Sequence, residues 1–187
     1  MKSRKILITA MLTLLWIQTW SAVPVRAGES PLVQVMNAIH NNDLSRLTAL
    51  LNLHREIINQ GDESKKNTPL HLAAFRKNSE AVKILLARGA NPDQPNSDGN
   101  TSLHYGAWWG DGDSMGLMIR AGAGVNARNN LGETPLHLSV MSGEPEKIKM
   151  LLYAGADKNI ADNRGQTPLE LARKRNHQIL VKLLQGK

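Results

Sequence analysis

The sequence predicts an all-α solenoid of about five stacked helix-turn-helix units with β-hairpin-like fingers between them. Four heptapeptides that begin with threonine recur at a constant step of 33 residues, and two series of glycines keep the same step. Hydrophobic residues make up 41% of the chain and aromatic residues only 4%, which is typical of a folded domain with an aliphatic core. A repeat of this length predicts units that bury their apolar faces against one another.

Each heptapeptide has the features of a helix start. In the first, Thr68 can cap a helix, and Pro69 occupies the first helical position, where its missing N–H costs nothing. A second helix is predicted near 79–88, and Gly89 should end it in a left-handed conformation. The periodic residues are Thr68, Thr101, Thr134 and Thr167, with the glycines Gly89, Gly122 and Gly155 and the glycines Gly99, Gly132 and Gly165.

The motif Thr-Pro-Leu-His-x-Ala at a 33-residue period resembles the ankyrin-repeat family. The resemblance covers residues 31–184 and implies a non-catalytic, monomeric protein–protein interaction module. The first unit lacks the heptapeptide, and the last has Glu170 and Arg173 in place of the usual His and Ala, so both are expected to be water-facing caps. We expect a domain at 28–187, with repeats near 31–63, 64–96, 97–129, 130–162 and 163–187.

Two repeats depart from the family pattern. Lys66 and Lys77 stand where the second repeat would usually have glycines, so we expect a looser loop there. In the third repeat, Ser102 replaces the proline and Tyr105 replaces a core leucine. This is therefore the least regular of the inner units, and irregular units often carry functional sites.

The first 27 residues have the pattern of a secretory signal peptide. Lys2, Arg4 and Lys5 precede an uncharged and mostly apolar run of 15 residues at 6–20, and a cleavage site follows at Ala27. The run is shorter than the roughly 20 residues that span a bilayer. We therefore expect a periplasmic or secreted protein; the alternative is an uncleaved membrane anchor.

Composition limits the chemistry. The chain has no cysteine, which excludes disulfides, thiol nucleophiles and cysteine metal sites. Four of the 23 basic residues and none of the 16 acidic residues lie in the first 27 positions. The remaining 19 basic and 16 acidic residues give the rest of the chain a net charge of +3, out of +7 for the whole chain. An excess that small does not indicate nucleic-acid binding.

The sequence predicts neither a catalytic site nor a metal site or cofactor. His71, His104 and His137 recur one repeat apart, about 8–10 Å, which is too far for them to share one zinc ion. The resemblance implies that they bond the preceding threonine and the adjoining loop. No nucleophile–base pattern and no phosphate-binding loop is present.

The partner-binding surface is predicted where the inner helices end. In the family, these positions line the concave face and vary with the partner. Tryptophan is enriched at interface hot spots, but one indole could instead pack between repeats in the space freed by Gly106. The predicted residues are Phe75, Arg76, Trp108, Trp109, Met141, Ser142, Lys174 and Arg175.

The function expected from these observations is binding of an exported protein. The resemblance implies an accessory or scaffold factor, because ankyrin proteins with bacterial-type signal peptides resemble partners of exported enzymes, including those against oxidative stress. The alternative is an inhibitor or immunity protein against a secreted toxin or enzyme. An enzyme would need titratable side chains that converge in a pocket.

Overall fold

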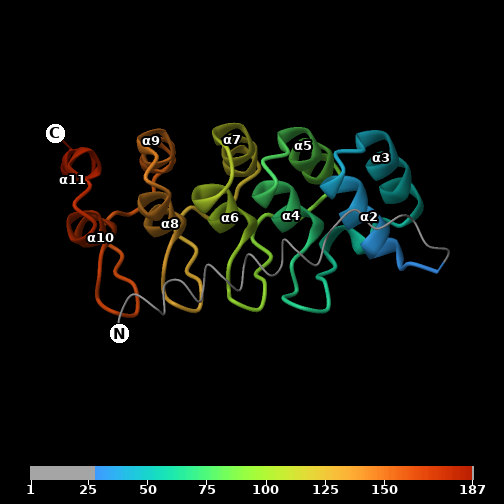
Figure 1. Cartoon of the computed structure of the whole chain (residues 1–187), viewed down its shortest axis with the longest axis horizontal. Coiled ribbons are helices and arrows are strands. Elements are labelled where there is room, and N and C mark those ends of the chain that lie inside the picture. The colour runs from blue at the N-terminus through green and yellow to red at the C-terminus, as the bar shows by residue number, and fades with distance from the viewer. Residues whose placement is uncertain (1–27, 187) are drawn as a thin grey trace.

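The computed structural model describes residues 28–186 as two parallel rows of helices (Figure 1). Loops that we call fingers project from the inner row, and no strand is assigned within these residues. The predicted all-α solenoid is confirmed, whereas the predicted signal peptide at 1–27 lies outside the described residues. The inner helices are α2 (Pro31–His40), α4 (Pro69–Phe75), α6 (Ser102–Trp108), α8 (Pro135–Ser142) and α10 (Pro168–Lys174). The outer helices are α3 (Leu44–Leu53), α5 (Ser79–Ala87), α7 (Gly112–Arg120), α9 (Pro145–Tyr153) and α11 (Gln178–Gln185).

Histidine fixes the start of three inner helices. The backbone N–H of Thr68 donates to Nδ1 of His71 at 3.2 Å, and Nε2 of His71 lies 2.9 Å from the carbonyl oxygen of Asn100. His104 and His137 repeat both contacts. The hydrogen bonds implied by the family resemblance are confirmed. In each repeat the Nδ1 contact fixes the helix start, and the Nε2 contact joins the helix to the next finger.

The outer helices α3, α5 and α7 have polar side-chain caps at their starts, and left-handed glycines follow the ends of α5, α7, α9 and α11. Asn78 and Asp111 accept the backbone N–H groups of Ala81 and Ser114 at 3.0 and 2.6 Å. Gly89 has a φ of 86°, which an L side chain adopts only with strain, so the predicted helix end is confirmed.

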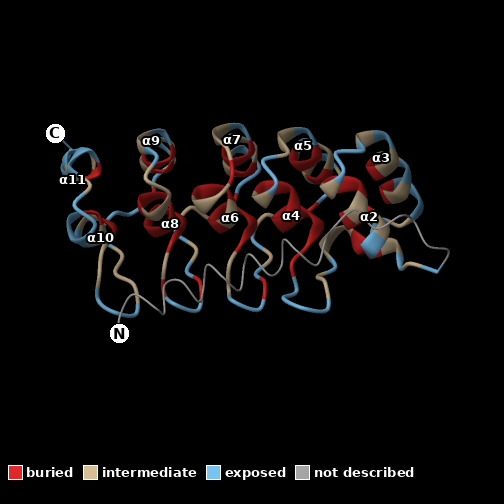
Figure 2. Cartoon of the chain, viewed as in Figure 1, coloured by how far each residue is buried: buried red, intermediate tan, exposed pale blue. Residues whose placement is uncertain are grey.

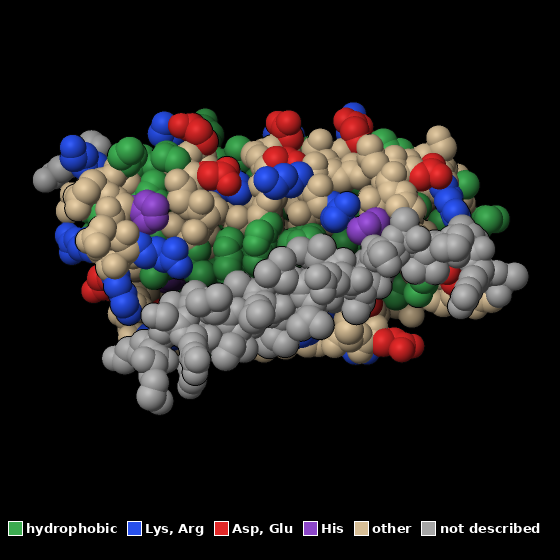
Figure 3. Space-filling view, in the orientation of Figure 1, with side chains coloured by type: hydrophobic (Ala, Val, Ile, Leu, Met, Phe, Trp, Pro, Cys, Tyr) green, Lys and Arg blue, Asp and Glu red, His purple; other side chains and the backbone are tan. Residues whose placement is uncertain are grey.

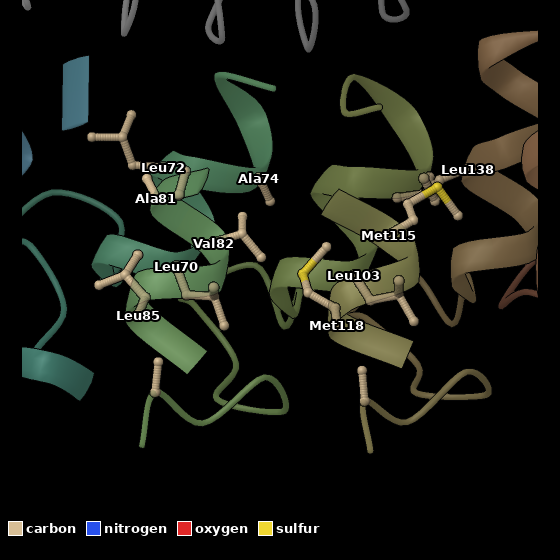
Figure 4. Close-up of a cluster of buried hydrophobic side chains, with 14 of the residues drawn as sticks. Leu70, Leu72, Ala74, Ala81, Val82, Leu85, Leu103, Met115, Met118 and Leu138 are labelled. Carbon is tan, nitrogen blue, oxygen red and sulfur yellow. The ribbon is translucent and has the colours of Figure 1, made fainter. Parts of the chain in front are cut away.

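The core is one apolar layer between the two rows. Leu70, Leu103 and Leu136 of the inner row are fully buried, and Met115 and Met118 of α7 lie in the same layer (Figure 4). Each buried aliphatic side chain contributes about 1.5–3 kcal/mol. Figure 2 shows that burial follows the inner row and the inward sides of the outer helices.

The fingers are linked to one another by backbone hydrogen bonds. The N–H groups of Ser97, Asn130 and Asn163 donate to a carbonyl oxygen of the preceding finger, at 2.8, 3.0 and 2.9 Å. These bonds join the fingers into a continuous edge without forming regular strands.

The prediction of a looser loop in the second repeat is wrong. Lys66 and Lys77 take the left-handed conformation that glycine usually supplies, with φ values of 59° and 57°. Before them, a 3-10 helix, η1 (Arg55–Asn59), buries Ile57 to 3% exposure, and Asn59 accepts the N–H of Asn91 at 2.7 Å. The segment is therefore fastened to the next repeat.

None of the helices between residues 28 and 186 has the length and apolarity needed to cross a bilayer. Glu170 and Arg173 of the last repeat are exposed, in the way that the sequence predicts for a cap.

Candidate functional site

The candidate site lies where α4, α6, α8 and α10 end. Consecutive inner helices pack against each other, so their C-terminal ends form one continuous surface. Hydrophobic side chains gather in the middle of the face seen in Figure 3, and basic and acidic side chains lie around them and along the row. We call this the inner surface and define it by the predicted residues Phe75, Arg76, Trp108, Trp109, Met141, Ser142, Lys174 and Arg175.

An aromatic cluster occupies the part of the inner surface that the ends of α4 and α6 form. The indoles of Trp108 and Trp109 are stacked, with ring centroids 3.9 Å apart and planes 15° apart. The edge of Phe75 meets Trp109 at 5.6 Å, and Tyr105 lies 5.7 Å from Trp109. Rings in such contact hold one another in place, which reduces the entropy lost when a partner binds.

The turn after α6 brings the cluster together. In all four other repeats the residue at the matching position, such as Lys77 or Gly143, has a positive φ, but Gly110 does not. Instead, the N–H groups of Trp109 and Gly110 both donate to the carbonyl oxygen of Tyr105, at 2.9 and 3.1 Å. A Cβ on Gly110 would lie 2.6 Å from Cα of Gly106, so only glycine allows the turn to fold this closely onto α6.

Neither tryptophan belongs to the core. Both are half-buried, and Trp108 packs against the edge of the core. The space over Gly106 is filled from α7 by Met118 and Met115, whose Cε and Cγ lie 2.8 and 3.1 Å from the point where a Cβ would stand. The alternative in which an indole fills that space is therefore wrong.

Tyr105 is a cluster member that the sequence reasoning missed. It was expected to replace a core leucine, but it is only half-buried, and its hydroxyl accepts from Nδ2 of Asn96 at 3.1 Å. Burial of the hydroxyl, with the nearby Asp98, raises the pKa of Tyr105 to about 12, so the ring stays neutral. Its position four residues before Trp109, on one face of a helix, is the signal that could have identified it.

The polar members flank the cluster. Arg76 is exposed and extends from the end of α4, where its Nη2 lies 3.4 Å from the carbonyl oxygen of His40. Met141 and Ser142 are half-buried at the end of α8. Lys174 and Arg175 are exposed at the end of α10, and Nζ of Lys174 donates to Gln166 at 2.9 Å. The inner surface thus has an aromatic cluster with Arg76 beside it on one side and Lys174 and Arg175 two repeats away on the other.

The histidines have structural roles that leave no nitrogen available for proton transfer. Burial lowers the pKa of His71 and of His104 to about 4, and burial also lowers the pKa of His137. Both ring nitrogens of each are engaged in the hydrogen bonds already described. Among residues 28–186, no three His, Asp or Glu side chains gather closely enough to hold a metal ion.

Comparison with known proteins gives short but consistent matches. A putative ankyrin repeat protein of fowlpox virus (strain NVSL) is 38% identical over 65 residues, which are 35% of this chain and 16% of the viral protein. The human palmitoyltransferase ZDHHC17 is 36% identical over 70 residues, 37% of this chain and 11% of the human protein. The chain therefore spans less than a fifth of either relative, and their whole-protein activities are not transferred to it.

The family comparison covers almost all of the described residues. A family described as ankyrin repeats (3 copies) matches residues 35–129 and 110–187. Ankyrin repeats in general mediate protein–protein contacts rather than catalysis. With the 33-residue period and the histidine bonds at three helix starts, this match shows that the chain belongs to the ankyrin-repeat family.

Proposed function

We propose that this protein is an exported, non-catalytic binding module that holds one protein partner on its inner surface. It would act as an accessory factor for another exported protein, such as an oxidative-stress enzyme. The support for export is the signal-peptide pattern of residues 1–27. The support for binding is the family together with the chemistry of the inner surface.

The aromatic cluster is the observation that carries the proposal. In a chain with 4% aromatic residues, Phe75, Tyr105, Trp108 and Trp109 are gathered at one place and none of them is fully buried. A folded protein gains stability by burying such rings, so the parts of them that stay exposed can contact a partner. Aromatic anchors at the centre of a polar surface are the usual composition of a binding hot spot.

Binding is tested by capture with a matched pair of variants. Residues 28–187 are immobilised and exposed to the exported fraction of the source cells, and retained proteins are identified by mass spectrometry. Trp109→Ala should weaken binding of the retained partner about 30-fold, because a central tryptophan contributes about 2 kcal/mol or more. Trp109 is preferred to Trp108, which also packs against the core.

Tyr153→Ala is the control, because Tyr153 is 97% exposed on α9 of the outer row. Equal retention by native protein and by Trp109→Ala would move the binding site away from the inner surface. Retention of nothing by the native protein at micromolar concentration would contradict the accessory role.

Export is tested by the N-terminal sequence of the protein recovered from the same fraction. A mature chain that begins at Gly28 is expected. A chain that retains residues 1–27 and sediments with membranes would support the anchor instead.

A further inference from the structure

We propose that the inner surface selects a partner segment in which an apolar centre is flanked on both sides by carboxylates. This inference rests on the proposed function and specifies the chemistry of its partner. The aromatic cluster supplies the apolar half of the recognition. The charges on both sides of the cluster supply the other half.

The inner surface has cations at both ends and no acid among its residues. Arg76 lies beside the cluster at the end of α4, and Lys174 and Arg175 lie two repeats beyond the tryptophans at the end of α10. All three are exposed, and no carboxylate of the described residues lies within ion-pairing distance of them. Their charges are therefore available to a partner rather than neutralised within the fold.

Three of the acids near the inner surface have partners of their own, whereas Asp113, four residues after Trp109, is exposed and forms no ion pair within the described residues. Asp111 caps α7 by accepting the N–H of Ser114 at 2.6 Å. Oε1 of Glu144 lies 2.9 Å from the ammonium of Lys147. Asp98, in the finger that precedes α6, forms an ion pair with Lys65 at 3.1 Å. Because Asp111, Glu144 and Asp98 make these local contacts, they neutralise little of the positive charge of the inner surface.

The cation of Arg76 faces a hollow large enough for a side chain. This pocket, about 350 Å³ in volume, lies between the ends of α2 and α4 and is also lined by His40, Lys77 and Glu80. Burial, together with Arg76, lowers the pKa of His40, so its ring adds no charge at neutral pH. Arg76 and Lys77 outnumber Glu80, so the pocket favours a carboxylate.

The spacing of the charges sets the length of the partner segment. Three repeat steps separate Arg76 from Arg175, and at about 8–10 Å for each step the span is roughly 24–30 Å. An extended segment advances about 3.3 Å per residue, so roughly 7–9 residues reach from one cationic end to the other. The carboxylates should therefore stand about that far apart, with apolar side chains between them.

A second copy of this chain does not fit the same surface. Two-fold pairing would set the Arg76 end of one copy against the Lys174 and Arg175 end of the other. Like charges would then meet at both ends of the interface and oppose pairing. A segment of a different protein that has carboxylates at those positions would avoid this repulsion.

The test is selection from a displayed library of random 12-residue peptides on the purified protein, followed by sequencing. Asp and Glu should be enriched on both sides of Trp, Phe, Leu or Met. The variant Arg76→Glu/Arg175→Glu should weaken binding of the selected peptides about tenfold or more and enrich Lys and Arg at the flanks instead. The control Lys83→Glu/Arg120→Glu makes the same change of net charge at exposed positions of α5 and α7 and should alter neither result.

The outcomes separate this inference from the proposed function. Enriched peptides that lack acidic flanks, but are lost from Trp109→Ala, would overturn the inference and leave the binding site in place. Enrichment that neither Trp109→Ala nor the charge reversal changes would overturn both. A native protein that self-associates through the inner surface would also overturn the inference, and gel filtration of native protein and Trp109→Ala would reveal it.

Discussion

At the scale of single residues, His71 and His104 show how burial converts a titratable group into a structural one. Nδ1 of each ring accepts a hydrogen bond from a threonine N–H, and Nε2 faces a carbonyl oxygen that can only accept a hydrogen bond. The ring is therefore neutral, with its proton on Nε2. A second proton on Nδ1 would oppose the threonine N–H, and burial lowers the pKa of both rings to about 4.

The stability of the fold should therefore fall as the pH falls from about 6.5 to about 4. In this window the unfolded chain binds protons at both rings and the folded chain does not, so protonation favours unfolding; above 6.5 the full stability is present. A pKa lowered from 6.5 to about 4 corresponds to on the order of 3 kcal/mol for each ring. Urea unfolding at a series of pH values measures the slope.

The assignment of this slope is checked with two variants. His104→Gln should lower stability at neutral pH and flatten the slope, because one ring no longer takes up a proton on unfolding. His54→Gln, at a histidine outside the heptapeptides, gives the background. A slope that His104→Gln leaves unchanged would contradict the buried neutral ring.

Lys147 gives a second prediction at this scale, because its side chain is 2% exposed while that of its partner Glu144 is 56% exposed. The matching residues of the second, third and fifth repeats are Ala81, Ser114 and Leu180, all buried, so an uncharged side chain fits the position. Lys147→Met should therefore be neutral or stabilising. Glu144→Gln leaves a buried ammonium without its counter-charge and should cost about 1–3 kcal/mol.

Chemical unfolding of both variants and of the double variant tests this expectation. The cost of Glu144→Gln should disappear once Lys147 is methionine. If Lys147→Met were the more damaging change, the aliphatic stem of Lys147, and not its charge, would be the part that the fold needs.

At the scale of elements, the turn after α6 decides how the tryptophans are presented. A Cβ on Gly110 would meet Cα and the carbonyl oxygen of Gly106 at 2.6 and 2.8 Å, and the carbonyl oxygen of Ala74 at 3.1 Å. All three atoms are backbone, so no side chain can move aside. Gly110→Ala should therefore cost about 1–3 kcal/mol and displace the stacked indoles.

Near-ultraviolet circular dichroism reports the displacement, because Trp108 and Trp109 are the only tryptophans after residue 27. Gly116→Ala in α7 is the matched control: its Cβ would meet only the flexible end of Arg120, at 3.1 Å. That change should raise stability by up to about 1 kcal/mol. A native spectrum and native stability in Gly110→Ala would show that the turn tolerates another geometry.

The elements also show what the sequence could and could not predict. The helix starts at Thr68 and Thr134 follow from capping and from the missing N–H of proline, and the start at Thr101 follows from capping alone; both effects act within a few residues. The left-handed conformation of Lys66 did not follow from its residue type, because lysine has no preference for it; within the folded finger, the N–H of Lys66 donates to the carbonyl oxygen of Asp62 at 3.2 Å. The stacked indoles could not be predicted either, since they depend on the close approach of Gly110 to Gly106.

At the scale of the whole molecule, burial is unevenly distributed along the stack. In α8, six consecutive residues from Pro135 to Val140 are buried, whereas α10 buries only Pro168 and Ala172. The last helix, α11, likewise buries only two residues, Leu180 and Leu184. In a repeat stack each unit is stabilised by its neighbours, and the last described pair has a described neighbour on one side only.

Hydrogen exchange should therefore be graded along the stack, because local opening needs less free energy where fewer apolar contacts are broken. Amides of α10 and α11 should exchange faster than those of α6 and α8. Lys174 and Arg175 stand at the end of α10, so a partner that spans the inner surface should slow exchange in that helix more than in α8. Exchange measured by mass spectrometry, with and without a selected peptide, tests both points. Protection confined to α4 and α6 would instead limit the contact to the aromatic cluster and remove the second cationic end from the binding site.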